Sequence, residues 1–195
     1  MNSGLLVVVS GPAGVGKGTV VSLVRERNND VVFSVSATSR KPRPGEIDGE
    51  NYYFVSQKEF EKMVQEDKLL EWVEYCGNYY GTPRYYVEEQ LSRGSVVILE
   101  IEVEGADRIK KKYPQCISVF ITPPDLEELR NRITRRGTES PDIIEKRMSQ
   151  AKKELEHISE YDYVIINHTV EESVDRFLSI MQEERHKRSV PGQEQ

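Results

Sequence analysis

Apolar residues in this chain gather in short continuous runs, and the segments between the runs have helical spacing. The first run, Leu5–Val9, shows no alternation of apolar and polar residues, which is typical of a strand buried on both faces of a parallel sheet. Further strands are predicted over residues 31–36, 96–101, 117–121 and 163–167. Helices are predicted over residues 17–27, 103–112, 125–135, 140–158 and 170–185. This order predicts right-handed crossovers and an α/β fold with a parallel sheet.

The segment 37–83 interrupts this alternation. It opens with a loop rich in proline, glycine and charge, which is compatible with neither a helix nor a central strand. Strands over residues 52–55 and 69–75 and a helix over residues 56–65 follow. Ser56 and Glu59 have the spacing of a capping box, and Thr82 before Pro83 is typical of an N-cap and the first residue of a helix. We therefore expect a small β-rich insertion in the parallel domain.

The chain length bounds the number of domains. Its 195 residues suffice for one well-buried core and are too few for two ordinary domains. We predict one domain made of a core, the β-rich insertion and a helical lid. The core would comprise residues 4–36, 84–123 and 159–187, the insertion residues 37–83, and the lid residues 124–158.

Charge and cysteine content narrow the class of protein. The net charge of −6 predicts that the chain binds neither nucleic acid nor a membrane surface. Cys76 and Cys116 form no CxxC pattern, which favours unpaired thiols in a reducing compartment over a zinc site or disulfides. The run Leu5–Val9 is too short for a signal-peptide core or a membrane span. We therefore expect a cytoplasmic protein.

A glycine-rich loop connects the first strand to the first helix. Its glycines are Gly11, Gly14 and Gly16. They allow backbone N–H groups to surround an anion, and Lys17 adds positive charge at the helix N-terminus. The spacing matches a phosphate-binding loop, except that Gly18 stands where the pattern has Ser or Thr and the hydroxyl follows at Thr19. The buried strand before the loop and the helical pattern after it argue against the alternative, a glycine-rich hairpin without a ligand.

Two further clusters suggest contacts to a nucleotide. Arg40, Lys41 and Arg43 lie close together in a proline-stiffened loop of an otherwise acidic chain, which favours a second phosphate site over a solvated surface loop. Glu100 and Glu102 end a buried strand, and the carboxyl ends of parallel strands hold ligand groups in open α/β sheets. Both carboxylates could equally be ordinary surface groups at a strand end.

Arginines collect in the predicted helical hairpin. Arg132 and Arg136 are four residues apart on one helix, and Arg147 lies on the next helix. Such a hairpin beside a nucleotide site has the composition of a lid. The alternative is a solvated surface in which the arginines pair with acidic neighbours. Those neighbours are Glu127, Glu128 and Glu145.

Several ordered motifs together resemble the guanylate kinase family over residues 5–185. These motifs are the loop Gly11–Thr19, the segment Phe33–Glu46, Tyr52–Phe54, Leu70–Trp72, Gly77–Thr82, Ile98–Glu102 and Arg135–Glu139. The resemblance implies a three-layer α/β/α core of the P-loop NTPase type. It also implies reversible transfer of a phosphoryl group from ATP to GMP, and to dGMP as a second acceptor.

The resemblance also implies the role of each site residue. GMP would be bound by Ser36, Arg40, Arg43, Tyr52, Glu71, Tyr80, Thr82 and Glu102. ATP would be bound by Gly11, Pro12, Ala13, Gly14, Val15, Gly16, Lys17, Gly18, Thr19 and Asn167. The catalytic cations would be Lys17, Arg40, Arg132, Arg136 and Arg147. Thr19 and Glu100 would hold Mg²⁺ through water. The chain departs from the common family pattern at two positions. Glu102 stands where the family commonly has Asp, and His168 stands where the family frequently has an acidic residue.

Residue chemistry agrees with this assignment. Guanine presents two N–H donors beside its O6 acceptor, so one carboxylate can accept both donors while a hydroxyl donates to O6. Adenine would leave Glu71 without partners. Two alternatives are a kinase for another nucleoside monophosphate and a guanylate-kinase-like interaction module without catalysis. The intact glycine loop with Lys17 argues against the module. We expect a monomer or homodimer with ATP and GMP as small-molecule partners.

Overall fold

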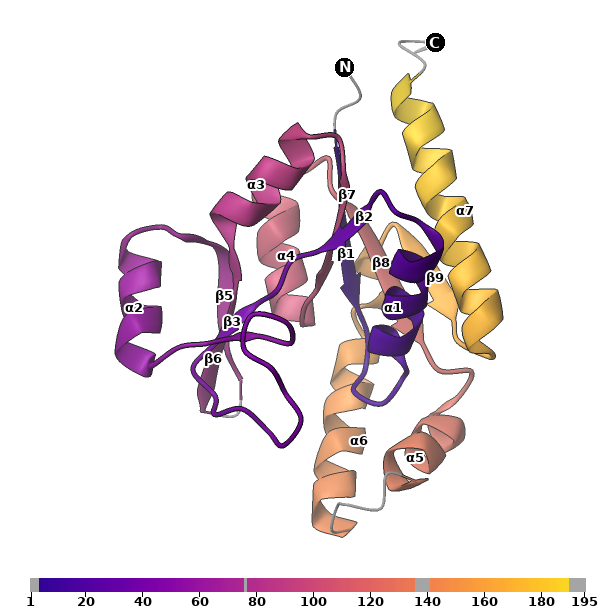
Figure 1. Cartoon of the computed structure of the whole chain (residues 1–195). Helices are drawn as coiled ribbons and strands as arrows, with labels where there is room; N and C mark the ends of the chain where they lie inside the picture. Colours follow the sequence, from indigo (N-terminus) through magenta and orange to yellow (C-terminus); the bar gives the residue numbers. More distant parts are fainter. Residues whose placement is uncertain (1–3, 76, 136–140, 190–195) are drawn as a thin grey trace.

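The computed structural model of the chain describes residues 4–75, 77–135 and 141–189. Its main sheet has five parallel strands in the order β2-β7-β1-β8-β9 (Figure 1). The strands are β1 (Leu5–Ser10), β2 (Val31–Phe33), β7 (Val96–Glu100), β8 (Ile117–Thr122) and β9 (Tyr163–Ile166). The helices that belong to this part are α1 (Lys17–Arg27), α3 (Arg84–Ser92), α4 (Val103–Lys112) and α7 (Val170–Ser189).

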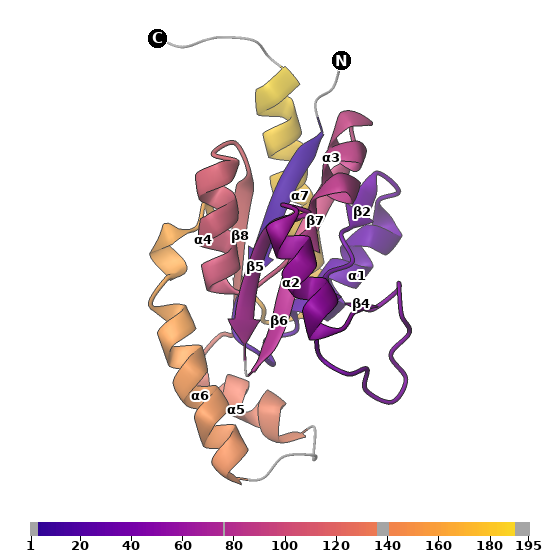
Figure 2. The same cartoon turned by 90° about the vertical axis from the view of Figure 1, so that its left-hand side faces the viewer.

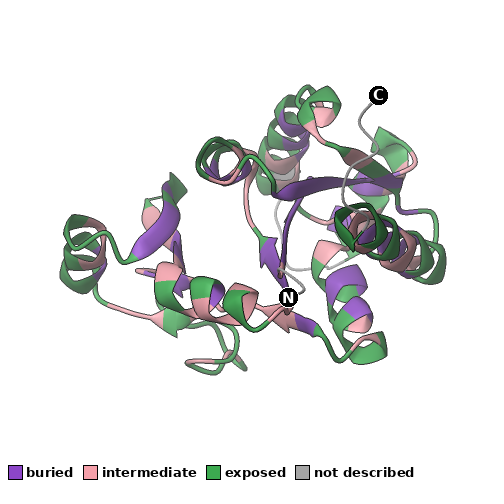
Figure 3. Ribbon diagram, turned by 90° about the horizontal axis from the view of Figure 1, so that it is seen from above, coloured by how far each residue is buried: buried purple, intermediate pink, exposed green. Residues whose placement is uncertain are grey.

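Both faces of the central strand β1 are buried, as its continuous apolar run predicts. Val7 and Val9 point into a cluster with Val20 of α1 and Phe177 of α7. Val8 points to the opposite face, into a cluster that contains side chains of α3 and α4. Seen from above, helices flank the sheet on both sides (Figure 3). The predicted α/β fold with a parallel sheet between two helical layers is confirmed.

A second, four-stranded sheet lies beside the parallel one, in the order β4-β3-β6-β5 (Figures 1 and 2). Its strands are β3 (Ala37–Thr38), β4 (Tyr53–Phe54), β5 (Leu69–Tyr75) and β6 (Asn78–Pro83), and helix α2 (Gln57–Gln65) lies between β4 and β5 in the chain. Phe60 of α2 packs with Ala37 and Leu69 in a small cluster of its own. The small sheet is joined to the main one by helix α4, which packs against both β1 and β5.

Two further helices, α5 (Leu126–Arg135) and α6 (Pro141–Leu155), pack against each other at the end of the main sheet where β1 leads into the glycine loop (Figures 1 and 2). A short 3₁₀ helix, η1 (Ile158–Glu160), follows. The helix predicted over 140–158 is therefore shorter, because the chain turns after Leu155. No helix within the described ranges is long and apolar enough to cross a membrane.

Two element boundaries differ from the prediction. The strand expected over 31–36 ends at Phe33, because the chain then leaves the main sheet and Ser36 accepts a hydrogen bond from Tyr53 of the small sheet. The prediction of Thr82 as an N-cap is wrong. Strand β6 continues to Pro83, which is itself the N-cap of α3. The Thr82 hydroxyl donates instead to a carboxylate on β5.

The predicted capping box at the start of α2 is confirmed. Ser56 Oγ accepts from the Glu59 backbone N–H at 3.2 Å, and Glu59 Oε2 accepts from the Ser56 backbone N–H at 2.8 Å. Two N–H groups that the helix itself cannot satisfy thus find partners.

We predict that Ser56→Ala lowers the free energy of unfolding by about 1 kcal/mol, because the cap is lost. Denaturant unfolding measures the effect, and amide hydrogen exchange should place it in α2. Ser149→Ala, at an exposed position inside α6, is the matched control and should not lower stability, because alanine is the better helix former at an interior position. Equal losses in the two variants would contradict the role of the cap.

Candidate active site

The glycine loop is pressed closely against the ends of the neighbouring strands. Gly11, Gly14 and Gly16 have positive φ angles of 144°, 92° and 96°, which favour glycine. A Cβ atom on Gly11 would lie 2.0 Å from the Ile121 carbonyl oxygen at the end of β8. The loop therefore requires glycine there both for its backbone conformation and for its packing.

Side chains from distant parts of the chain hold this loop in place. Asn167 Nδ2 donates to the Val15 carbonyl at 2.7 Å, and Asn167 Oδ1 accepts from Ser173 of α7 at 2.9 Å. The Arg132 guanidinium donates to the carbonyls of Val15 and Asn167 at 3.3 and 3.0 Å. Beside them lies a cavity of about 290 Å³. It is lined by Gly14, Val15, Gly16, Arg132, Arg135, Asn167, His168 and Val170.

Lys17, the first residue of α1, folds back onto the loop. Its ammonium donates to the carbonyls of Gly11 and Pro12. It also lines a second cavity of about 260 Å³, together with Tyr52, which directly precedes β4 of the small sheet, and Glu100 at the end of β7. The lysine therefore stands between the glycine loop and a space that the small sheet helps to enclose.

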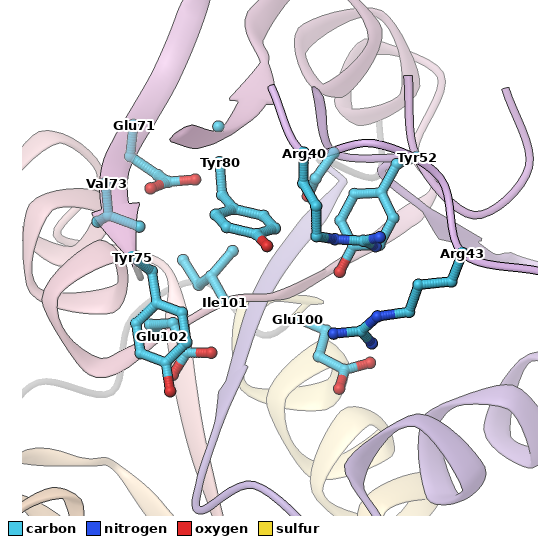
Figure 4. A pocket seen from close by; sticks show the side chains of 12 residues that line it. Arg40, Arg43, Tyr52, Glu71, Val73, Tyr75, Tyr80, Glu100, Ile101 and Glu102 are labelled. Carbon is cyan, nitrogen blue, oxygen red and sulfur yellow. The ribbon is translucent and has the colours of Figure 1, made fainter. Parts of the chain in front are cut away.

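A third cavity, of about 170 Å³, lies between the two sheets (Figure 4). Seven of the residues predicted to bind GMP line it, namely Ser36, Arg40, Arg43, Tyr52, Glu71, Tyr80 and Glu102. Thr82 contacts the cavity only indirectly, since its hydroxyl donates to Glu71 Oε1 at 2.7 Å from behind. The structure thus brings the predicted set together from β5, β6, the basic loop and the end of β7.

Glu71 is the most deeply buried acid of this cavity. Its side chain comes from β5, is only 5% exposed and faces the cavity (Figure 4). Burial raises the pKa of its carboxyl, while the hydrogen bond from Thr82 and the charge of Arg108 oppose that shift. A buried carboxylate is stabilised by hydrogen-bond donors, and the cavity in front of Glu71 has room for a ligand that supplies donors besides Thr82.

Arg40 is held by an acidic residue of its own loop that the sequence analysis did not single out. Glu46 accepts two hydrogen bonds from the Arg40 guanidinium, at 2.8 and 3.0 Å, and a third from the Arg43 backbone N–H at 2.6 Å. The Arg40 guanidinium also lies 5.4 Å from the centre of the Tyr52 ring. The sequence feature that could have identified this pair is the position of Glu46, a carboxylate six residues after Arg40 in the same turn-rich loop.

The two acids at the end of β7, Glu100 and Glu102, both line the two cavities between the sheets. Glu100 faces the open cleft, and Arg43 extends toward it from the opposite wall (Figure 4). The pKa of the Glu100 carboxyl is raised, chiefly by burial. The negative charge of Glu102 adds to this shift, and the positive charge of Lys17 opposes it. Glu102 stands at the N-cap position of α4 and lines both cavities between the sheets.

Of the three predicted lid arginines, Arg132 is bonded to the glycine loop. Besides its bonds to the loop, it donates to Glu128 at 2.8 Å. Arg147 lies on α6 and is half-buried. Arg136 lies outside the described residues. The predicted pairing with acidic neighbours therefore occurs at Arg132, but the same arginine also contacts the glycine loop.

Comparisons with known proteins agree with this geometry. A family model described as guanylate kinase matches residues 3–184. Guanylate kinases of Desulfitobacterium hafniense and Halalkalibacterium halodurans are 50% and 52% identical over 184 and 185 residues, which cover 94% and 95% of this chain and 92% and 91% of those proteins. The chain belongs to the guanylate kinase family. The crystal structure of guanylate kinase from Anaplasma phagocytophilum has a TM-score of 0.80 and 34% identity, covering 95% of this chain and 88% of that one.

Membership of the guanylate kinase family confirms the predicted class of enzyme, an ATP-dependent kinase of GMP. Neither alternative considered from the sequence, a kinase for another nucleoside monophosphate or a non-catalytic module, is supported by these relatives. The roles of individual residues in this guanylate kinase fold stay predictions.

For this guanylate kinase we predict that Glu71→Gln raises stability at neutral pH. Because the folded pKa of Glu71 lies above its ordinary value of 4.5, the folded state binds this proton more tightly than the unfolded state. The cost of the charge is therefore absent below pH 4.5 and complete above the raised folded pKa. Thermal unfolding across pH should give the variant a higher midpoint at neutral pH and a shrinking advantage on acidification. A gap that widens toward acid would contradict the sign.

We also predict that Glu46→Gln weakens GMP binding without affecting ATP. The neutral amide holds the Arg40 guanidinium less firmly, and a loss of about 1 kcal/mol corresponds to an increase of about fivefold in the KM for GMP. Steady-state kinetics with each nucleotide varied in turn measure the effect. Glu61→Gln, an exposed change of the same charge on α2, is the control.

Proposed function

We propose that this enzyme binds GMP in the cavity between its two sheets and ATP on the glycine loop, and transfers the γ-phosphoryl group across the cleft that separates them. The products are ADP and GDP. The observation that carries the proposal is the convergence of a buried carboxylate, a basic loop and a glycine loop with its lysine on adjoining cavities.

Glu71 would recognise the guanine base. Its carboxylate accepts hydrogen bonds from the N1–H and 2-amino groups of guanine, and the hydroxyl of Ser36 donates to O6. Thr82 acts through Glu71, because its hydroxyl already donates to one oxygen of that carboxylate. Glu102 lines the same cavity and would approach the base from the side of α4. Adenine has one amino donor beside an acceptor, so it would leave the buried carboxylate partly unpaired.

The phosphate of GMP would lie among Arg40, Arg43, Tyr52 and Tyr80. Two guanidinium groups and two phenol hydroxyls provide charge-assisted donors for phosphate oxygens. Support comes from the fact that all four line the cavity that Glu71 also lines. Glu46 would keep the Arg40 fork oriented toward the phosphate.

The phosphates of ATP would occupy the glycine loop, where backbone N–H groups and the N-terminus of α1 favour anions. Lys17 would exchange the carbonyls of Gly11 and Pro12 for phosphate oxygens, which carry full charge. Asn167, beside the cavity next to the loop, would contact the adenine. Arg132, Arg136 and Arg147 would neutralise charge on the transferred group.

The residues fit Mg²⁺ bound together with ATP. Glu100 Oε2 lies 3.7 Å from the place that a Cβ atom on Gly18 would take, so it stands beside Gly18 in the first turn of α1, and the exposed Thr19 is the next residue of that turn. In the described ranges no three His, Cys, Asp or Glu side chains could hold a metal ion by themselves. We propose that Thr19 and Glu100 bind the ion through water while phosphate oxygens complete its shell. The ion would neutralise charge on the phosphates.

Phosphoryl transfer has a loose transition state, so positioning and positive charge supply most of the catalysis. The acceptor phosphate is already ionised and needs no general base. Water must be excluded, because an open site would hydrolyse ATP. We therefore propose that the insertion 37–83 and the lid 124–158 close over the nucleotides as separate parts of one domain.

The predicted cytoplasmic location is consistent with the buried free thiol of Cys116. We still expect the enzyme to be a monomer or a homodimer.

An assay of ADP release with GMP or AMP as acceptor tests the proposal. We expect kcat/KM to favour GMP by about 10⁴-fold, and Lys17→Ala to lower kcat by about 10³-fold or more with GMP binding retained. Lys58→Ala, an exposed lysine on α2, is the control. A preference for AMP would overturn the assignment of the base site, and an active Lys17→Ala would overturn that of the loop.

A further inference from the structure

Helix α4 meets strand β5 through a residue that has no side chain. A Cβ atom on Gly105 would lie 2.9 Å from Glu71 Oε2 and 3.4 Å from Glu71 Cδ. Gly105 is part of regular helix and is not among the described residues with positive φ, so its backbone conformation does not require glycine. Glycine is also a poor helix former compared with alanine. Its presence here is explained by the carboxylate that packs against it.

The helix cannot move away from the strand to make room at this point. Lys112 of α4 donates to the Leu70 carbonyl at 2.7 Å, and the Arg108 guanidinium donates to the Trp72 carbonyl. Leu70 and Trp72 are the two neighbours of Glu71 in β5. Ala106 of α4, next to Gly105, is buried in the same apolar cluster as Leu70. Polar bonds on both sides of Glu71 thus set the spacing between the helix and the strand.

We propose that Gly105 is a positioning residue for base recognition. Its bare Cα lets the Glu71 carboxylate lie back against α4, with Oε1 on the Thr82 hydroxyl, and leaves the cavity in front of the carboxylate for the base. This inference rests on the proposed role of Glu71 in binding guanine. Gly105 touches no substrate and acts only through the position of Glu71.

A methyl group at position 105 would contact two flexible side-chain ends, Glu71 Oε2 at 2.9 Å and Ile101 Cδ1 at 3.4 Å. Because the contact with Glu71 is the shorter one, the carboxylate is the group that must be displaced. The carboxylate would swing into the cavity and lose the hydrogen bond from Thr82. The backbone of α4 and the apolar cluster beneath it would be kept, because no backbone atom stands among the nearest contacts of that methyl group.

The test is Gly105→Ala, assayed with GMP and with inosine monophosphate, which lacks the 2-amino group. We expect the KM for GMP to rise ~10- to 100-fold, as for lost charge-assisted hydrogen bonds, and the KM for ATP to change less than about twofold. The preference for GMP over inosine monophosphate should fall, because the displaced carboxylate no longer meets the 2-amino group. The thermal midpoint should be equal to or above that of the wild type.

Glu71→Asp provides the matched background, because a side chain one carbon shorter is expected to withdraw the carboxylate from Gly105. There, Gly105→Ala should change the KM for GMP by less than about threefold, so the two substitutions are strongly non-additive. Equal effects of Gly105→Ala in both backgrounds, an unchanged KM for GMP, or equal losses for GMP and ATP would overturn the inference.

Glu71→Gln separates the failure of the proposed base site from the failure of the role of Gly105. If it keeps full preference for GMP, the base site itself is wrong; if it loses that preference while Gly105→Ala behaves as wild type, only the role of Gly105 fails.

Discussion

The packing of helix α4 between the two sheets is the contact on which the site depends. Its apolar side packs against β1 of the main sheet, and its Lys112 and Arg108 donate to backbone carbonyls of β5 in the small one. The helix starts directly after Glu100 and Glu102, the carboxylates at the end of β7. One helix therefore sets the distance between the cavity that would hold GMP and the strand ends that carry the glycine loop.

This arrangement keeps a carboxylate in a place where water is scarce. Burial of Glu71 costs free energy, which the Thr82 hydroxyl and the positive charges of Arg108 and Lys112 only partly offset. A base that supplies two N–H donors compensates for that cost, whereas a base with the wrong donors does not. In the proposed role of Glu71, the stability lost by burying the charge would thus be the source of the discrimination between purines.

The cations of the site already have partners within the protein. Lys17 is bonded to loop carbonyls, Arg132 to Glu128 and the loop, and Arg40 to Glu46. The partners of Lys17 are neutral dipoles, so a phosphate can replace them with a gain in charge interaction. The partner of Arg40 is a carboxylate, which orients the guanidinium and reduces the net charge of the acceptor site. The donor and acceptor phosphates would therefore meet cations prepared in different ways.

The sequence alone determined the features that depend on neighbours along the chain. The buried strand Leu5–Val9, the capping box at Ser56 and the glycine loop each follow from residue types at short spacing. The family resemblance then supplied the residues predicted for both nucleotide sites, including Glu71.

The tertiary structure decided which side chains hold those residues in place. Thr82 looks like a helix cap from its neighbours, yet its hydroxyl donates to Glu71 across the ladder of β5 and β6. Asn167, directly after β9, donates a hydrogen bond to the Val15 carbonyl of the glycine loop. Gly105 of α4 leaves room for the side chain of Glu71 on β5. Such contacts join segments far apart in the chain. No local pattern encodes them, because they arise only when the two sheets and α4 pack together.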